Sequence, residues 1–404
     1  MNHTIVKANQ YDFAPAHAAM QRYVDGKILS GVSSAVLVGR DLVDLHCAGY
    51  ADIENNIPLR SDHLFRAFSN TKLVTSCAVM LLVEEGRLGL DDPVERYIVQ
   101  LGNRRVLKTG AKSIEDTEPA QGSITIHHLL SHSSGLSYGL LDPGTTIYKT
   151  YIAAKVLNPA QTLAEMMDAL APLPLVFHPG TGWEYSVATD VLSRVVEVVS
   201  GLGFDAFIQT RIFEPLGMID TGFVVPKEKQ SLLTAYYAGA DLLNPMKPGL
   251  TRADQAPWPG AYLSPVPRLS GGGGLVTSLP DMLAFMRSFL PGGLTLLKAE
   301  TIASMMTNQL AEKVRIGFPN LGRVEGKGFG LGGAVTLTPS SLDPKESTGE
   351  FQWGGIAGTH WWISPRKNLA GLLMTQRQMA FWHPFSFEFK QLVYGAVEKE
   401  GRPS

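Results

Sequence analysis

Cysteine is scarce in this sequence, because 404 residues contain only Cys47 and Cys77. Each lies in an apolar stretch, so we expect two buried free thiols rather than a disulfide. The longest apolar stretches are far shorter than the roughly 20 residues that a membrane-spanning helix requires. The N-terminus also lacks the apolar segment of a secretory signal. We therefore expect a cytoplasmic protein with no membrane partner.

Charged residues are also few, at 18% of the chain, where globular proteins average about 25%. The 35 Lys and Arg residues nearly balance the 37 Asp and Glu residues, which gives a formal net charge of -2. A chain without excess positive charge has little attraction for polyanions, so we expect no nucleic-acid partner. Hydrophobic residues make up 45% of the chain, which favours a large folded interior over disorder.

Alternating hydrophobicity, which is typical of strands, occurs near the two ends of the chain. The first two alternating runs predict an antiparallel hairpin around Arg40 and Asp41. The predicted strands are residues 34–38, 43–50, 64–68, 332–337, 359–363 and 369–375. The predicted helices are residues 16–24, 70–85, 126–130, 163–170, 187–199, 204–213, 280–289 and 385–399. Asp92 and Pro93 are expected to be the N-cap and first residue of another helix.

This order of elements predicts an α/β protein of the α+β type, with an antiparallel sheet flanked by helices. Residues 1–85 and 270–404 would form one discontinuous sheet domain, and residues 86–269 a mainly helical domain. Within the latter, residues 245–267 contain six prolines together with Trp258 and Tyr262, and show little periodicity. We expect them to form a long ordered loop that shapes a binding site.

Ser69 and Lys72 open the helix that follows the predicted strand 64–68. Their spacing of three residues places the hydroxyl and the ammonium group on one helical face. At the helix start, free backbone N–H groups and the positive dipole end can stabilise an oxyanion. A lysine can activate a serine if burial or a neighbouring positive charge lowers the lysine pKa. Taken alone, S-x-x-K also fits an ordinary serine-capped helix.

Longer motifs accompany this pair along the chain. In order they are FRAFSNTKLVTS, ITIHHLLSHSSGL, FHPGTGWEYSVATD, SGGGGLVTSLPDM and QWGGIAGTHWW. Together they resemble the serine β-lactamase and penicillin-binding-protein superfamily over residues 15–395, and within it the family VIII carboxylesterases and the related acyltransferases. The resemblance implies a β-lactamase-like fold with the site in a cleft between the sheet and the helical region.

The same resemblance implies a role for each of the central residues. Ser69 matches the nucleophile, Lys72 its base, and Tyr185 the tyrosine that relays the proton to the leaving group. The backbone N–H groups of Ser69 and Ile356 would form the oxyanion hole.

Trp353, Gly354 and Gly355 stand where the superfamily has its K-T-G strand, and the glycines would let the backbone approach a ligand. Trp353 replaces the lysine of the β-lactamases, and Val187 replaces their asparagine. Without this lysine charge and this asparagine amide at the edge of the substrate-binding site, we expect weaker binding of anionic β-lactams and a preference for neutral esters.

Other local patterns suggest competing sites. Residues 135–139 fit the G-x-S-x-G nucleophile elbow around Ser137, but a helical pattern precedes them where a strand is required. Residues 328–333 fit G-x-G-x-x-G, yet a strand-like segment follows where a phosphate site needs a helix. His128 and His132 are four residues apart without the glutamate of a zinc motif, so we expect structural histidines and no metal site. His360 either contacts substrate or caps the sheet.

The sequence therefore predicts a serine hydrolase that cleaves small carboxylic esters, with short- to medium-chain acyl groups, without a cofactor. Hydrolysis of β-lactams would be a weak side activity at most. The expected substrate-binding residues are Trp353, Gly354, Gly355, Val187, Trp258, Tyr262 and His360. The alternatives are an acyltransferase that uses an acceptor other than water, a β-lactamase or D-amino-acid peptidase, and a non-enzymatic binding protein. Retention of Ser69, Lys72 and Tyr185 together argues against the last. The sequence carries no signal of oligomeric state.

Overall fold

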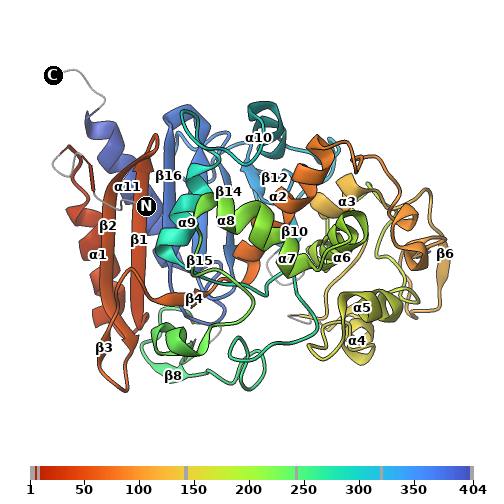
Figure 1. Ribbon diagram of the computed structural model, residues 1–404, viewed down its shortest axis with the longest axis horizontal. Coiled ribbons are helices and arrows are strands. Elements are labelled where there is room, and N and C mark those ends of the chain that lie inside the picture. The colour runs from red at the N-terminus through yellow and green to blue at the C-terminus, as the bar shows by residue number, and fades with distance from the viewer. Residues whose placement is uncertain (1–4, 7–9, 141–143, 242–243, 319–321, 401–404) are drawn as a thin grey trace.

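An eight-stranded antiparallel sheet forms the centre of the molecule (Figure 1). The computed structural model describes residues 5–6, 10–140, 144–241, 244–318 and 322–400. In spatial order the strands are β12 (Lys327–Phe329), β13 (Ala334–Thr336), β14 (Phe351–Gly355), β15 (Thr359–Ser364), β16 (Leu369–Met374), β1 (Gly31–Val38), β2 (Asp41–Asp52) and β3 (Ile57–Pro58). Because β16 pairs with β1, strands from the two ends of the chain form one sheet.

The hairpin of β1 and β2 explains how the sheet starts. Val38 pairs with Asp41, which leaves Gly39 and Arg40 as a two-residue turn. Gly39 has a φ of +58°, a conformation that glycine adopts without steric cost and that such turns require. The predicted hairpin is therefore present, but its turn lies one residue earlier than expected.

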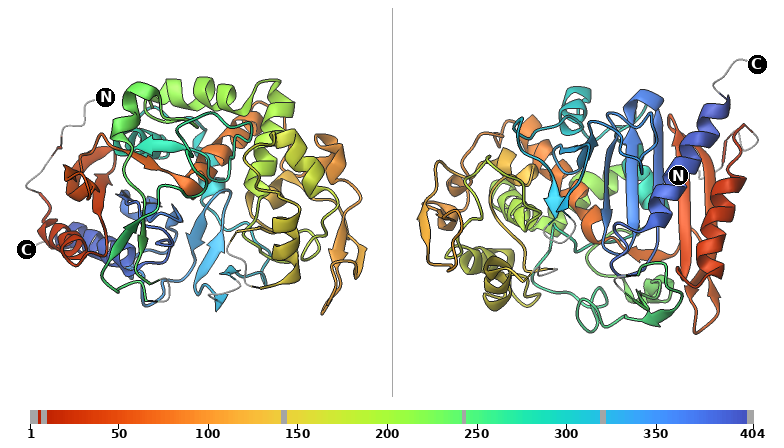
Figure 2. Two further views of the ribbon diagram at one scale, coloured as in Figure 1. Left: turned by 90° about the horizontal axis from the view of Figure 1, so that it is seen from below. Right: turned by 180° about the vertical axis from the view of Figure 1, so that it is seen from behind.

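Helices cover both faces of this sheet. One face packs against α1 (Ala14–Asp25) and α11 (Pro384–Glu400), which lie in front of the strands in the rear view of Figure 2. The opposite face packs in the main core with α2 (Thr71–Glu84), α6 (Ala188–Ser200) and α9 (Leu279–Arg287). An antiparallel sheet flanked by helices is the predicted fold class.

The segment between α2 and α9 consists of short elements joined by long loops. Its further helices are α3 (Ile126–Leu130), α4 (Thr146–Ala153), α5 (Leu163–Leu170), α7 (Phe204–Ile208) and α8 (Glu214–Leu216). Small two-stranded sheets pair β4 (Leu64–Arg66) with β9 (Val276–Ser278), β5 (Arg105–Leu107) with β6 (Thr117–Pro119), and β7 (Tyr237–Gly239) with β8 (Leu250–Arg252). After α9 follow α10 (Ala299–Met305) and the hairpin of β10 (Gly317–Phe318) and β11 (Gly322–Arg323). The domain boundaries at residues 86 and 269 stay a prediction.

Two predicted helices were wrong in detail. The helix expected over residues 204–213 is α7 followed by a π-helical turn, Gln209–Phe213. Asp92 and Pro93 do not begin an α-helix, because Pro93 is extended and precedes a single 3-10 turn, Val94–Arg96. The Asp92 carboxylate instead accepts hydrogen bonds from the Gly89 N–H and the Tyr97 hydroxyl.

The two cysteines differ in burial. Cys77 is buried in α2, as expected, but Cys47 is only part-buried, where its thiol lies 2.9 Å from the Ser33 hydroxyl. The expectation of two buried thiols was therefore wrong for Cys47. In the described part of the chain, no helix combines the length and the apolar character needed to cross a membrane.

Asp281 in the first turn of α9 links the folded state to pH. It is buried and accepts hydrogen bonds from the Thr221 hydroxyl and the Asp220 N–H, and burial raises its pKa from 3.8 to about 6. The folded state therefore binds this proton more tightly than the unfolded chain. The stabilisation that protonated Asp281 gives the folded state is fully present below the pKa of this carboxyl in the unfolded chain. It is lost as the pH rises through the pKa in the folded state, about 6.

We expect Asp281→Asn to remove this part of the pH dependence. Titration of Asp281 should lower the unfolding free energy of the wild type as the pH rises from about 4 to about 7. We expect this decrease to be about 2 kcal/mol smaller in the variant. Urea unfolding at both pH values measures the difference. Glu300→Gln, at an exposed acid in α10, is the control. Identical pH slopes for the wild type and Asp281→Asn would show that Asp281 does not titrate in this range.

Candidate active site

Ser69 lies in a 3-10 turn, Phe68–Asn70, between the end of β4 and the start of α2. β4 ends at Arg66, two residues earlier than the predicted strand. Phe68 has a φ of +44°, an uncommon conformation for a residue with a large side chain. Such strain persists only where the surrounding structure enforces it, and it is enriched at functional sites. Here it occurs directly before the candidate nucleophile.

Lys72 is buried in the first turn of α2, beneath Ser69. Its ammonium nitrogen donates to the Gly272 carbonyl at 2.6 Å and lies 3.5 Å from Ser69 Oγ. Burial lowers the Lys72 pKa, but Tyr185, Tyr138 and nearby Asp190 more than offset it, so the net pKa is raised. This direction is opposite to the lowered pKa on which the sequence argument depended. Lys72 is thus a cation in the resting site.

Tyr185 completes the centre of the site. Its hydroxyl donates to Ser69 Oγ at 2.6 Å, and its ring lies 4.7 Å from the Lys72 ammonium nitrogen. Tyr138 stacks on the Tyr185 ring at 5.6 Å, and Trp353 from β14 lies 5.5 Å from it. The structure therefore brings together Ser69, Lys72 and Tyr185, three residues that lie up to 116 positions apart in the sequence.

A buried carboxylate lies behind Lys72. Asp190 in α6 accepts a hydrogen bond from the Ser270 hydroxyl at 2.6 Å and lies 3.7 Å from the Arg268 guanidinium. Its second oxygen, Oδ2, is buried without a hydrogen-bond partner in the described residues. A Cβ added to Gly272 would lie 2.5 Å from this oxygen and 3.4 Å from the Lys72 nitrogen. Gly272 must therefore be glycine for Asp190 and Lys72 to share this space.

Sequence analysis missed Asp190, Arg268 and Tyr138. Nothing local marks Asp190, which is an ordinary polar residue in the first turn of a helix. The run of glycines at residues 271–274 was the one available signal, since a Cβ at Gly271 would overlap Ser193 and one at Gly272 would overlap Asp190. That run indicates a close backbone approach without telling which side chain it approaches.

The end of β14 lies against the turn that holds Ser69. A Cβ at Gly355 would lie 2.6 Å from the Ala67 carbonyl oxygen and 3.2 Å from Phe68 Cβ, so glycine is required there. The Ile356 carbonyl accepts a hydrogen bond from Ala380, whereas the Ile356 and Ser69 N–H groups make no hydrogen bond to the described residues. Two free donors on neighbouring segments are what an oxyanion hole requires.

The predicted binding loop 245–267 approaches this turn from the other side. Tyr262 is buried, donates to the Gly273 carbonyl at 3.2 Å, and places its ring 6.1 Å from Phe68. Trp258 stacks on Tyr262 at 6.3 Å. Both aromatic residues of the loop therefore lie close to the segment that holds Ser69, although Tyr262 is separated from Ser69 itself by Phe68.

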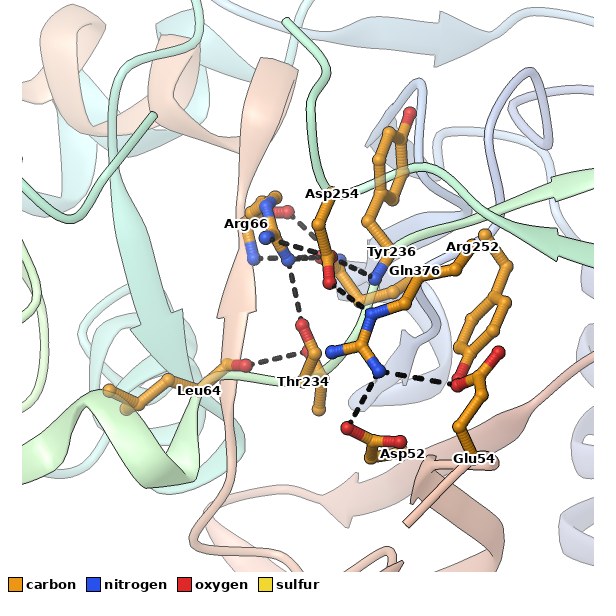
Figure 3. A network of polar contacts seen from close by, with 10 residues as sticks. Asp52, Glu54, Leu64, Arg66, Thr234, Tyr236, Arg252, Asp254 and Gln376 are labelled. Atoms are coloured by element: carbon orange, nitrogen blue, oxygen red, sulfur yellow. Dashed lines mark hydrogen bonds and ion pairs between the residues drawn. The ribbon is translucent and has the colours of Figure 1, made fainter. Parts of the chain in front are cut away.

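A polar network attaches this loop to the sheet (Figure 3). Asp254 accepts hydrogen bonds from the Arg66 guanidinium at 3.2 Å, the Tyr236 N–H at 2.7 Å and the Arg252 guanidinium at 2.6 Å. Arg252 also donates to Asp52 at the end of β2 at 2.9 Å. Since Arg66 is the last residue of β4, the network joins the loop to the strand that leads into Ser69.

Two predicted substrate-binding residues lie elsewhere. Val187 is fully buried in the main core at the start of α6, so its side chain offers no polar contact and no exposed surface. His360 on β15 faces the α11 side of the sheet, 6.3 Å from Phe385. Burial lowers the pKa of His360 to about 4, so the ring is neutral at pH 7.

The competing patterns have structural explanations. Ser137 is buried in an irregular segment, donates to Glu184 and has neither a preceding strand nor a following helix. Residues 328–333 form the β12–β13 hairpin, with no helix after it. His128 caps α3 and His132 bonds to the Ser186 hydroxyl. The described residues contain no group of side chains able to hold a metal ion.

A wall of aromatic rings extends from Tyr185 to the surface. Phe318 lies 5.9 Å from Tyr185, and Phe381 lies 5.2 Å from Trp353 and 4.6 Å from Trp382. Phe318, Phe381 and Trp382 are half-buried. The approach to Ser69 along this wall is therefore apolar.

Comparison with known proteins identifies the family of this chain. A sequence model of the Beta-lactamase family matches residues 16–381. Esterase EstB of Burkholderia gladioli is 32% identical over 85% of this chain and 86% of its own, and lovastatin esterase of Penicillium rubens is 31% identical over 78% and 80%. The structure of EstCE1, a hydrolase with promiscuous acyltransferase activity, superimposes with a TM-score of 0.77 at 25% identity, over 95% of this chain and 98% of that one. The chain belongs to the Beta-lactamase family, in which its relatives include esterases and acyltransferases.

Proposed function

We propose that the protein hydrolyses carboxylic esters through an acyl-enzyme on Ser69. The observation that carries the proposal is the 2.6 Å hydrogen bond from the Tyr185 hydroxyl to Ser69 Oγ, with the Lys72 ammonium group beneath both. The pair acts as a base once it has lost one proton, as a Tyr185 phenolate beside a Lys72 ammonium. Because Lys72 is buried, little solvent screens the attraction that stabilises this phenolate.

The reaction then follows in two balanced halves. Tyr185 takes the Ser69 proton as Oγ attacks the ester carbonyl, and the N–H groups of Ser69 and Ile356 hold the oxyanion. The intermediate collapses as Tyr185 returns the proton to the leaving oxygen, so that the alcohol departs and Ser69 stays acylated. A water molecule attacks in the same way, gives its proton to Tyr185, and releases the acid. Ser69 recovers its proton at the end.

The surroundings of Ser69 favour neutral esters over anionic β-lactams. Trp353 places an indole against Tyr185, at the position where the superfamily's β-lactamases carry a lysine, and its indole nitrogen makes no hydrogen bond to the described residues. The wall of Trp353, Phe318 and Phe381 offers apolar contact to an acyl chain or an alcohol of short to medium length.

Acyl transfer is the second candidate. The approach along the aromatic wall disfavours water and favours an organic acceptor, which would take the acyl group from Ser69 in the second half-reaction. The similarity to EstCE1 supports this candidate. Product analysis with a nitrophenyl ester and an added alcohol separates the two, because hydrolysis alone yields no new ester.

Replacement of Ser69 should distinguish the two serines proposed as nucleophiles. We expect Ser69→Ala to lower kcat/KM for nitrophenyl esters at least about 10³-fold, because no other group can form the acyl-enzyme. Ser137→Ala should keep activity within about three-fold of wild type after correction for folded fraction, since the Ser137 hydroxyl donates to Glu184 rather than to Ser69, Lys72 or Tyr185. A panel of esters of increasing chain length and one chromogenic cephalosporin measures both. Full activity of Ser69→Ala would refute the proposal.

Replacement of Asp190 should move the pH profile. The negative charge of Asp190, which is one of the groups that raise the Lys72 pKa, opposes loss of a proton from the neighbouring Tyr185 and Lys72 pair, so the pair in Asp190→Asn should lose its proton at lower pH. We expect the rise of kcat/KM with pH to shift downward by about one unit. Asp205→Asn, at an exposed carboxylate on α7, should leave the profile in place. A profile that shifts equally in both variants would reflect general surface charge instead.

A further inference from the structure

A cavity on the α11 face of the sheet adjoins the outer end of the aromatic wall that leads to Ser69. Its lining includes Lys327, Gln352, His360, Trp382, Phe387 and Lys390, together with Trp353 and Phe381 of that wall. Gln352 pairs with Trp362, which packs in the core beside α1 and α11, whereas the next residue, Trp353, belongs to the main core with α2. Because side chains alternate along a strand, Gln352 and Trp353 point to opposite faces. The polar floor of the cavity and the Ser69 site therefore lie on opposite faces of β14, whereas Phe381 contacts both Trp353 and His360.

The floor of the cavity is a buried network of charges. Lys390 in α11 donates to Glu350 at 2.7 Å and to Gln352 at 2.8 Å. Lys327 in β12 donates to Asp343 at 2.7 Å and to the Thr336 hydroxyl at 2.7 Å. The two lysines and the two acids balance in charge, and all four are buried. An ammonium group has three N–H donors, so each lysine has one beyond these two hydrogen bonds. The Lys390 nitrogen also lies 3.8 Å from the Asp343 carboxylate, which is longer than a hydrogen bond.

His360 adds a polar atom without a partner. Its Nε2 is buried and makes no hydrogen bond to the described residues. Lys390 and His383 both disfavour a positive charge on this ring, and Phe381 and Phe385 pack against it. A buried polar atom of this kind is rare in folded proteins unless water or a ligand completes it. The remaining N–H groups of Lys327 and Lys390 and the unpaired ring nitrogen of His360 therefore line the same cavity.

The mouth of the cavity is apolar. Trp382 stacks on Phe387 at 6.5 Å and meets Phe381 edge to face at 4.6 Å. All three rings are half-buried, so they present both a ring face and an opening to solvent. A ligand that fits has a polar end for the floor and an apolar body for the mouth.

We propose that this cavity binds a carboxylic acid with an apolar body. The carboxyl oxygens accept hydrogen bonds from the remaining N–H groups of Lys327 and Lys390, and the carboxyl group and His360 Nε2 share one proton. The hydrocarbon body lies against Trp382 and Phe387. Because the carboxyl group shares its proton with His360, binding adds little net charge to the network of two lysines and two acids. The ammonium groups are stronger donors to a carboxyl than to an amide, so we expect the acid to be preferred. The site does not depend on the proposed esterase reaction, although that reaction would release such an acid.

Binding of hexanoate and hexanamide, followed by tryptophan fluorescence, tests the proposal. The protein is used with Ser69 blocked by a fluorophosphonate, or as Ser69→Ala if no label forms, so that failure of the esterase proposal leaves this test intact. We expect saturable binding of hexanoate, at least about ten-fold tighter than that of hexanamide. Lys327→Met should abolish this preference. Phe387→Ala, at a half-exposed ring, should weaken hexanoate at least about five-fold.

Three binding results would each overturn the proposal. Equal affinity for hexanoate and hexanamide, or no saturable change, overturns the proposal. Hexanoate binding that Phe387→Ala leaves unchanged overturns it too, because the acid then binds elsewhere. Lys327→Met removes the cation that pairs with the buried Asp343 carboxylate, so the melting curve of this variant is measured first. If that variant is unfolded, the hexanoate to hexanamide ratio and Phe387→Ala decide the question.

Discussion

The burial of Lys72 is the constraint on which the rest of the site depends. A buried ammonium group is stable only where opposite charge or strong acceptors surround it. Here the Gly272 carbonyl accepts from it directly, Asp190 lies beyond Gly272, and the Tyr185 ring faces it. Tyr185 and Asp190 come from one segment and Gly272 from another, both more than 100 residues from Lys72 in the sequence, so the cation can be held only in the completed fold.

This requirement explains several local features that otherwise have no common cause. Gly271 and Gly272 are glycines because α2 and α6 leave no room for a Cβ between them. Gly355 is a glycine because β14 ends against the turn of Ser69. The sheet allows these approaches together, since β14 comes from the C-terminal segment and α2 from the N-terminal one, and the pairing of β1 with β16 fixes them relative to each other.

Part of the fold and part of the site could be predicted from the sequence, because they depend on residues that are close together in the chain. The spacing of Ser69 and Lys72 is a helical relation that needs no tertiary knowledge, and the alternating runs of β1, β2, β15 and β16 were enough to place these strands, although β1, β15 and β16 are buried on both faces. Tyr185 could be named only through the motif order. Asp190 could not be found, because its role depends on a helix crossing set by distant packing. Cys47 and Val187 show the converse error, since residue type and motif position do not determine which way a side chain faces.

The aromatic surroundings of Ser69 also have an electrostatic consequence. A lysine at position 353 would place a second cation near Tyr185, where it would stabilise a phenolate but repel the Lys72 ammonium. Trp353 removes that competition, so in the proposed mechanism the charge that would stabilise a Tyr185 phenolate comes from Lys72, which lies near Asp190. An indole packed against the Tyr185 ring also excludes water from the pair, which strengthens the attraction between phenolate and ammonium. The site therefore combines a small cluster of buried charges, Lys72, Asp190 and Arg268, with aromatic rings that cover it.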